Sequence, residues 1–291
     1  MTWRTVVIRE RAKLDYSLNF MTVRQEAGVR KISLGEIYMV IVENTAVSLT
    51  AVLLNELVKN KIKVVFCDEK RNPSSELIQY YGSHDTSLKY KNQLEWSKEN
   101  KEKIWTRIVY EKIFNQMQFL KKLNKEEYRL LEQYLSELEW NDSSNREGFA
   151  AKVYFNALYG MDFSRNKECF INAALDYGYS IILSAFNREI VASGYFTQLG
   201  LCHRNPFNKF NLSSDFMEPF RILVDEEVYN LEGTEFTKDH KNKLINILNK
   251  TVIIDDKNQT VVNAIKIYCR SLFSALAEND LEYIKMYRYE L

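Results

Sequence analysis

The chain has 291 residues, of which 46% are hydrophobic and 27% are charged. This composition is typical of a soluble globular protein and excludes disordered, collagen-like and low-complexity chains. The 40 basic and 39 acidic residues give a net charge of +1, so a nucleic-acid partner would have to be bound by local basic patches. The four cysteines lie far apart, which indicates reduced thiols. No apolar run is long enough to span a membrane, and we expect a cytoplasmic protein.

The first part of the chain shows the pattern of short strands. Runs of β-branched and aromatic residues occur at TVVIRE, KLDYSLNF and YMVIVE. A helical pattern over residues 48–59 follows, and then an apolar strand, IKVVFCD. Turn-forming residues at RNPSS and at Gly82–Ser83 mark a boundary. We therefore predict a small N-terminal β domain with one helix over residues 1–82.

Helical periodicity dominates the rest of the chain. We predict an α+β protein whose larger second domain, residues 83–291, is all-helical. Asn124 with Glu127, and Ser144 with Glu147, have the spacing of capping boxes at helix starts. The second pair opens the helix FAAKVYFNALYG, and a longer helix is predicted over residues 171–191. The segment VIIDDKNQTVV is either a hairpin or a loop.

Of the three histidines, only His203 has neighbours that suggest a site. His84 and His240 lie in polar stretches and are expected at the surface. Asp215 and Glu218 follow His203 and, three residues apart, face the same way on a helical turn. A histidine with converging carboxylates can bind a divalent metal ion. The alternative is a loop histidine followed by acids that favour a helix N-terminus, and the spacing does not decide between them.

Several common catalytic motifs do not occur in the sequence. GxxxxGK[ST], GxGxxG, HExxH and GxSxG are all missing, so nucleotide cradling and hydrolase-type nucleophiles are not expected. Cys202 adjoins His203, but neighbours on irregular backbone seldom face each other as nucleophile and base. We assign this thiol only a packing role.

Three segments together resemble the CRISPR adaptation integrases, the universal CRISPR-associated proteins that insert new spacers, and in particular their type II branch. SLTAVLLNELVKNKIKVVFCDEKRNP resembles the segment before the last strands of the family's β domain. REGFAAKVYFNALYG resembles its Glu-bearing helix. The block from INAALDYGYS to SSDFMEPFR ends in the family's His loop and D-L-M-E-P-F-R signature. Phe216 and Ile222 depart from that pattern, and residues 226–291 resemble the family least.

The resemblance implies a site and a reaction. Glu147, His203 and Glu218 would be the catalytic ligands of Mg²⁺ or Mn²⁺, and Asp215 an outer-shell residue or a ligand of a second metal. The implied reaction is a transesterification in which the 3′-hydroxyl of incoming DNA attacks a phosphodiester at the edge of a CRISPR repeat. The basic residues that flank these ligands in sequence are candidates for phosphate contacts or for ion pairs: Arg146, Lys152, Arg204, Lys209 and Arg221.

The resemblance also implies partners. These are double-stranded DNA (the prespacer and the CRISPR repeat), a second copy of the chain in a homodimer, and a small companion CRISPR-associated protein. The RNA-guided effector nuclease and a ring-shaped DNA-end-binding protein are further candidates in type II systems. Two alternatives stay open: a metal-dependent DNA-repair-type nuclease without integration, and a non-catalytic helical DNA-binding scaffold.

Overall fold

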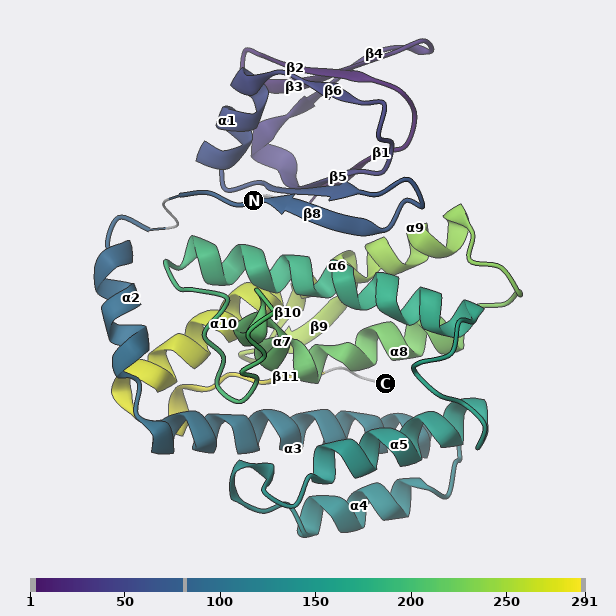
Figure 1. Ribbon diagram of the computed structural model, residues 1–291, viewed down its shortest axis with the longest axis vertical. Coiled ribbons are helices and arrows are strands. Elements are labelled where there is room, and N and C mark those ends of the chain that lie inside the picture. Colours follow the sequence, from purple (N-terminus) through teal and green to yellow (C-terminus); the bar gives the residue numbers. More distant parts are fainter. Residues whose placement is uncertain (1–3, 81–82, 289–291) are drawn as a thin grey trace. The chain divides into compact units, whose positions relative to one another are not determined.

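The computed structural model describes residues 4–80 and 83–288. Contacts divide the chain into two compact units, one of Met1–Thr86 with Val191–Gly194 and one of Ser87–Ile190 with Tyr195–Leu291. The first unit is rich in strands and the second in helices (Figure 1), which confirms the predicted α+β class. The boundary expected at residue 82 lies outside the described residues.

The N-terminal unit contains two four-stranded sheets. The first has the order β1-β5-β7-β8 and the second the order β4-β3-β2-β6. The strands of the first are β1 (Arg4–Ile8), β5 (Ile37–Val42), β7 (Lys63–Cys67) and β8 (Pro73–Leu77). Those of the second are β2 (Lys13–Ser17), β3 (Phe20–Gln25), β4 (Gly28–Ser33) and β6 (Ser48–Leu49). One apolar core includes side chains from both sheets and from the helix α1 (Ala51–Lys59).

The segment KLDYSLNF, predicted as one strand, is a hairpin. Leu18 and Asn19 have positive φ angles of 48° and 65°, and they turn β2 back into β3. Asn tolerates this left-handed backbone, but Leu does not favour it, so the sequence carries only a weak turn signal here. The RNPSS stretch, predicted as boundary, contains the start of strand β8.

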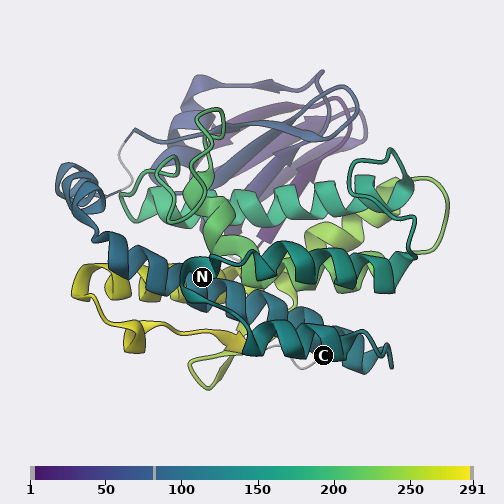
Figure 2. The same cartoon turned by 60° about the horizontal axis from the view of Figure 1, so that its bottom comes forward.

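Helices make up most of the second unit (Figure 2). They are α2 (Thr86–Glu95), α3 (Lys98–Lys122), α4 (Tyr128–Ser136), α5 (Arg146–Tyr159), α6 (Phe170–Ala192), α7 (Asn211–Met217), α8 (Arg221–Tyr229), α9 (Lys238–Asn246) and α10 (Val261–Glu278). Short 3₁₀ turns include η2 (Trp140–Asp142) and η3 (Glu218–Phe220). No described helix combines the length and the apolar character needed to cross a membrane.

The second unit was predicted to be all-helical. This prediction is wrong, because the unit contains a small sheet. Strands β9 (Thr251–Ile254), β10 (Lys257–Thr260) and β11 (Tyr287–Arg288) pair in the order β10-β9-β11. VIIDDKNQTVV is therefore a hairpin, and Asp255 and Asp256 take positive φ at its turn. The two residues of β11 are too few to show a strand pattern in the sequence.

Aromatic residues form much of the core of the helical unit. Phe216, Phe220 and Tyr268 are fully buried, and the ring centroid of Tyr268 lies 6.4 Å from that of Phe216 and 5.4 Å from that of Phe220. The α3 helix packs against α4 and α5, as Figure 1 also shows. This arrangement places the first turn of α5 beside the middle of α3.

The two capping boxes predicted from the sequence are wrong. Asn124 has a φ of 54°, and α4 begins only at Tyr128, without a side-chain cap. The Oγ atom of Ser144 has no hydrogen-bond partner in the structure. Helix α5 is capped instead by the carboxylate of Asp142, which accepts the backbone N–H of Arg146 at 2.6 Å and that of Glu147 at 3.2 Å.

Gly178→Ala tests how closely α6 approaches α8. An added Cβ would lie 2.4 Å from Cγ1 of Val224, so the side chain of Val224 or the helices would have to shift. We expect the free energy of unfolding to fall by about 1–3 kcal/mol in urea denaturation. In the control Gly35→Ala, the new Cβ would meet only Oγ of Ser33 at 3.7 Å. A stabilised Gly178→Ala protein, as helix propensity alone would give, would contradict this close packing.

Candidate active site

The carboxylates of Glu147 and Glu218 meet at one ammonium group. Glu147 lies in the first turn of α5, Glu218 begins η3, and Lys112 lies on α3. Nζ of Lys112 is 2.5 Å from Oε1 of Glu147 and 2.5 Å from Oε2 of Glu218. Nε of Arg221 donates to the same Oε2 of Glu218 at 2.9 Å. The fold thus brings together two of the three ligands predicted from the sequence.

The positive charges explain how Glu218 can be buried in ionised form. Its side chain is only 3% exposed. Burial alone would raise the pKa of Glu218, but the charges of Arg221 and Lys112 outweigh it and lower the pKa to about 2. In the same way, burial would lower the pKa of Lys112, but Glu218 and Glu147 outweigh it and raise the pKa. Glu218 and Lys112 therefore stay ionised at neutral pH.

The turn that carries Glu218 is fixed through the carbonyl of the next residue. Nδ2 of Asn115 donates to the carbonyl oxygen of Pro219 at 3.1 Å. The hydroxyl of Tyr287 donates to the same oxygen at 2.7 Å. Because these donors come from α3 and from the C-terminal strand β11, the position of Glu218 depends on elements far apart in the sequence.

His203 lies in the loop between α6 and α7, and the fully buried Asp215 holds that loop. Oδ2 of Asp215 accepts the backbone N–H of Leu201 at 2.6 Å and of Cys202 at 3.1 Å. Oδ1 accepts the backbone N–H of His203 at 3.2 Å and also contacts Nδ1 of its ring. The ring nitrogen that Asp215 leaves unengaged is therefore Nε2. The His203 side chain is 42% exposed.

The pKa of His203 is raised above its usual value. Its hydrogen bond to Asp215 raises the pKa of His203, burial opposes this, and the charges of Glu218 and Glu147 add to the rise. Burial raises the pKa of Asp215, and the hydrogen bond from His203 partly offsets that rise. Within residues 4–80 and 83–288, however, no three His, Cys, Asp or Glu side chains converge as a formed metal site. Lys112 occupies the position between the two glutamates instead.

The sequence of the His loop allows unusually close backbone packing. A Cβ at Gly200 would lie 2.5 Å from the carbonyl oxygen of His203 and 2.7 Å from Oδ2 of Asp215, so only glycine fits. Nδ2 of Asn211 donates to the carbonyl oxygens of Gln198 and Asn205, each at 3.0 Å. The amide side chains thus satisfy backbone groups in this irregular segment, which keeps the loop in one conformation.

A hollow of about 450 Å³ adjoins His203. Arg204 and Lys209 line it and are exposed, and Phe207 in the same loop is 92% exposed. The other basic candidates differ from these two. Lys152 is exposed on α5, whereas Arg146 pairs with Glu137 at 2.9 Å and Arg221 pairs with Glu218.

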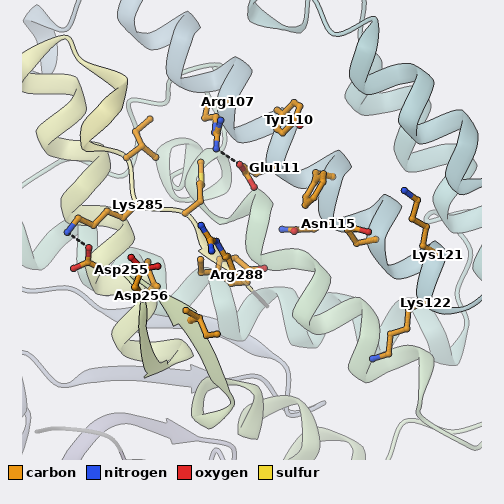
Figure 3. A pocket seen from close by; sticks show the side chains of 17 residues that line it. Arg107, Tyr110, Glu111, Asn115, Lys121, Lys122, Asp255, Asp256, Lys285 and Arg288 are labelled. Atoms are coloured by element: carbon orange, nitrogen blue, oxygen red, sulfur yellow. Dashed lines mark hydrogen bonds and ion pairs between the residues drawn. The ribbon is translucent and has the colours of Figure 1, made fainter. Parts of the chain in front are cut away.

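Another hollow, of about 850 Å³, lies between α3, the β9–β10 turn and β11 (Figure 3). Its charged side chains largely pair with one another or with nearby acids. Arg107 pairs with Glu111 at 2.6 Å, and Lys285 pairs with Asp255 at 2.8 Å, as the dashed lines show. We assign this hollow no part in the chemistry.

Three residues around the site were not identified from the sequence: Lys112, Asp142 and Phe207. Lys112 does carry a signal, because it interrupts the buried stripe of Ile108, Val109 and Ile113 on α3. A lysine on the buried face of a helix requires a paired charge.

For Cys202, burial raises the pKa to about 11, so its thiol is protonated at neutral pH and is a poor nucleophile.

The sequence comparisons identify the family of the chain. The family model described as "CRISPR associated protein Cas1" matches residues 5–266. The CRISPR-associated endonuclease Cas1 of Neisseria meningitidis serogroup C is 32% identical over 292 residues, which cover 98% of this chain and 96% of that protein. A CRISPR-associated endonuclease Cas1 of Pyrobaculum aerophilum is 27% identical over 239 residues, or 75% of this chain and 78% of that protein.

Solved structures share the fold. A casposase bound to integration product matches with a TM-score of 0.78 at 18% identity, over 97% of this chain and 92% of that one. TM1797, a Cas1 protein from Thermotoga maritima, matches with a TM-score of 0.74 at 18% identity, over 96% and 98%. A chain of a Cas6-RT-Cas1–Cas2 complex matches with a TM-score of 0.76 at 18% identity over 97% of this chain, which spans 36% of that longer chain. Identities this low show the fold alone.

Together, the fold and the relatives define a CRISPR-associated endonuclease. The chain belongs to the Cas1 family. This confirms the family predicted from the three sequence segments, and with it the enzyme class of CRISPR adaptation. The names of the relatives favour an enzyme over the scaffold without chemistry.

Asp215→Asn tests whether this carboxylate holds the His loop. One amide oxygen cannot replace two carboxylate oxygens, and the amide N–H₂ would face backbone N–H donors. We expect the pKa of His203 to fall in an NMR titration and the free energy of unfolding to drop by about 1–3 kcal/mol. Cys202→Ser is the control, because it leaves the bonds to Asp215 in place. An unchanged pKa of His203 in Asp215→Asn would contradict this role.

Proposed function

We propose that the chain catalyses DNA strand transfer with Mg²⁺ or Mn²⁺ held by Glu147, Glu218 and Nε2 of His203. The observation that carries this proposal is that the two glutamates already share one cation, the ammonium of Lys112, at 2.5 Å from each. Carboxylate oxygens suit both metals, and the imidazole favours Mn²⁺. The donor set therefore fits a divalent cation, which when bound would polarise the scissile phosphoryl group as a Lewis acid.

Asp215 fits the outer-shell role better than that of a second metal ligand. Its two oxygens already accept three backbone N–H groups and contact the ring of His203. A carboxylate on Nδ1 fixes the orientation and tautomer of a histidine that binds metal through Nε2. In this proposal Asp215 is a positioning residue, and the loop that it holds sets where Nε2 lies.

The proposed reaction exchanges one phosphodiester for another. The 3′-hydroxyl of the incoming strand attacks phosphorus at the repeat edge. A new P–O bond forms while the bond from that phosphorus to the 3′ oxygen of the target strand breaks. The attacking hydroxyl loses its proton and the departing 3′ oxygen takes one up, so no nucleotide hydrolysis is required. The two carboxylates and the imidazole would contribute by holding the cation beside the reacting groups.

The hollow beside His203 is the proposed path of DNA to the site. Exposed Arg204 and Lys209 can contact phosphates, and the exposed ring of Phe207 can stack on an unpaired base. Structures titled as a casposase bound to integration product and a TtCas1–DNA complex, at 18% and 15% identity, support a DNA substrate. Arg146 and Arg221 are ion-paired and are weaker candidates for this role.

We also propose that the chain acts as a homodimer together with a small companion CRISPR-associated protein. The likeness to a chain of a Cas6-RT-Cas1–Cas2 complex supports a companion of this kind. Participation of the RNA-guided effector nuclease stays a prediction.

A nuclease that cuts DNA without joining it is the alternative, and the likeness to a casposase with an integration product favours joining.

Glu147→Gln tests the metal-dependent site. The amide keeps the shape of the side chain but loses the charge that binds the cation, and α5 keeps its cap because Asp142 supplies it. We expect strand transfer of a labelled oligonucleotide into a repeat-bearing plasmid to fall to background in Mn²⁺. The free energy of unfolding should change by about 1 kcal/mol or less. Glu132→Gln on the exposed face of α4 is the matched control.

The same assay distinguishes integration from the alternative. Labelled oligonucleotide joined to the plasmid in the wild type supports an integrase. Plasmid that is cut without any joined product would show a nuclease only. Normal joining by Glu147→Gln would remove Glu147 from the site.

The double variant Arg204→Ala/Lys209→Ala tests the DNA path. If each side chain neutralises one phosphate, DNA affinity should fall, and the slope of log K against log salt should become shallower by about 0.7–0.9 for each lost contact. Titrations of a fluorescent oligonucleotide at several salt concentrations measure both quantities. Lys59→Ala in the N-terminal unit is the control. An unchanged slope in the double variant would show that DNA takes another path.

A further inference from the structure

Lys112 is placed where a bound metal ion would have to interact with the two glutamates. Its side chain is only 11% exposed, and Nζ lies 2.5 Å from one oxygen of Glu147 and one of Glu218. The two carboxylates approach each other from different elements, α5 and η3, and Lys112 joins them from a third, α3. Without a cation here, the two negative charges would repel each other.

The charges of this cluster balance with the lysine present. Glu147 and Glu218 carry two negative charges, and Lys112 and Arg221 carry two positive ones. Adding a divalent cation while Lys112 stays in place would set four positive charges against the two carboxylates of these four side chains. Burying positive charges without enough negative partners costs free energy. The lysine and the divalent cation therefore compete for the two carboxylates.

We infer that Lys112 holds the Glu147–Glu218 pair together while no divalent cation is bound, and that its ammonium leaves both carboxylates when the cation binds. The inference rests on the proposed metal-binding function. Lysine suits this role because its charge sits at the end of a flexible four-carbon stem, whereas the planar arginine fork would hold both carboxylates more rigidly. Arg221 would keep its hydrogen bond to Glu218 when the cation binds. Its guanidinium also lies 4.5 Å from the ring centroid of Tyr179.

Removing the ammonium should therefore have opposite effects on the metal-free and the metal-bound protein. Lys112→Met leaves the two carboxylates to repel each other without metal, so the metal-free protein should melt at a lower temperature than the wild type. The variant also removes the competing cation. Its affinity for Mn²⁺ should rise about tenfold, which corresponds to about 1.4 kcal/mol. A purely structural lysine would give the loss of stability without the gain in affinity.

The experiment compares full-length wild type, Lys112→Met and the control Lys121→Met, a lysine on the same helix that pairs with Glu132 at 3.5 Å outside the cluster. Tm is measured in EDTA and in MnCl₂, and the Kd for Mn²⁺ is measured by electron paramagnetic resonance. We expect Lys112→Met to show a lower Tm in EDTA, a larger rise of Tm with Mn²⁺ and a Kd lowered about tenfold. Lys121→Met should match the wild type in its response to Mn²⁺.

The outcomes separate the inference from the proposed function. A wild type that does not bind Mn²⁺ would overturn the proposed metal site. A wild type that binds Mn²⁺, with Lys112→Met binding it equally or more weakly, would overturn only the role of Lys112. If Lys112→Met does not fold, the ¹⁵Nζ signal of Lys112 in the wild type decides, with Lys112→Arg used for its assignment. The signal should shift when Mg²⁺ saturates the site, and an unchanged signal at saturation would contradict the inference.

Discussion

The site depends on how the protein holds the carboxylates of the half-buried Glu147 and the buried Glu218 next to each other. Such a pair is stable in a helical core only with a cation between the two groups, and Lys112 supplies that charge at 2.5 Å from each. Because the three residues come from α3, α5 and η3, this one ionic contact also sets the spacing of those elements. In the proposed function a divalent cation binds at this position, where Lys112 supplies the positive charge in the metal-free protein.

The same constraint shapes the His loop in a different way. Here the buried carboxylate of Asp215 is satisfied by three backbone N–H groups and by the ring of His203. Gly200 allows the backbone to come close enough for these bonds to form. A loop without regular secondary structure thereby gains a fixed conformation, with Nε2 of its histidine left free of Asp215. The glutamate pair and the His loop are thus both held in position by a carboxylate that pairs with nearby donors or cations.

The sequence contains the broad outline of this structure but not its details. The α+β class, the family and the grouping of Glu147 with Glu218 could be predicted, because long periodic helices and specific motifs carry strong signals. The role of Lys112 could not be predicted, since no sequence motif indicates which carboxylates a buried lysine contacts in the folded protein. The caps were misread because Asp142 reaches α5 from a 3₁₀ turn, whereas the capping-box pattern assumes Ser144 at the helix start.

The proposed site is tested by anomalous diffraction from crystals of the protein soaked in MnCl₂, which locates the metal. We expect one strong manganese peak within coordination distance, about 2.0–2.3 Å, of oxygens from Glu147 and Glu218 and of Nε2 of His203. Nζ of Lys112 should have moved away from both carboxylates, and Asp215 should still hold the His loop. A manganese peak elsewhere in the helical unit, or none between these three residues at saturating Mn²⁺, would contradict the proposed site.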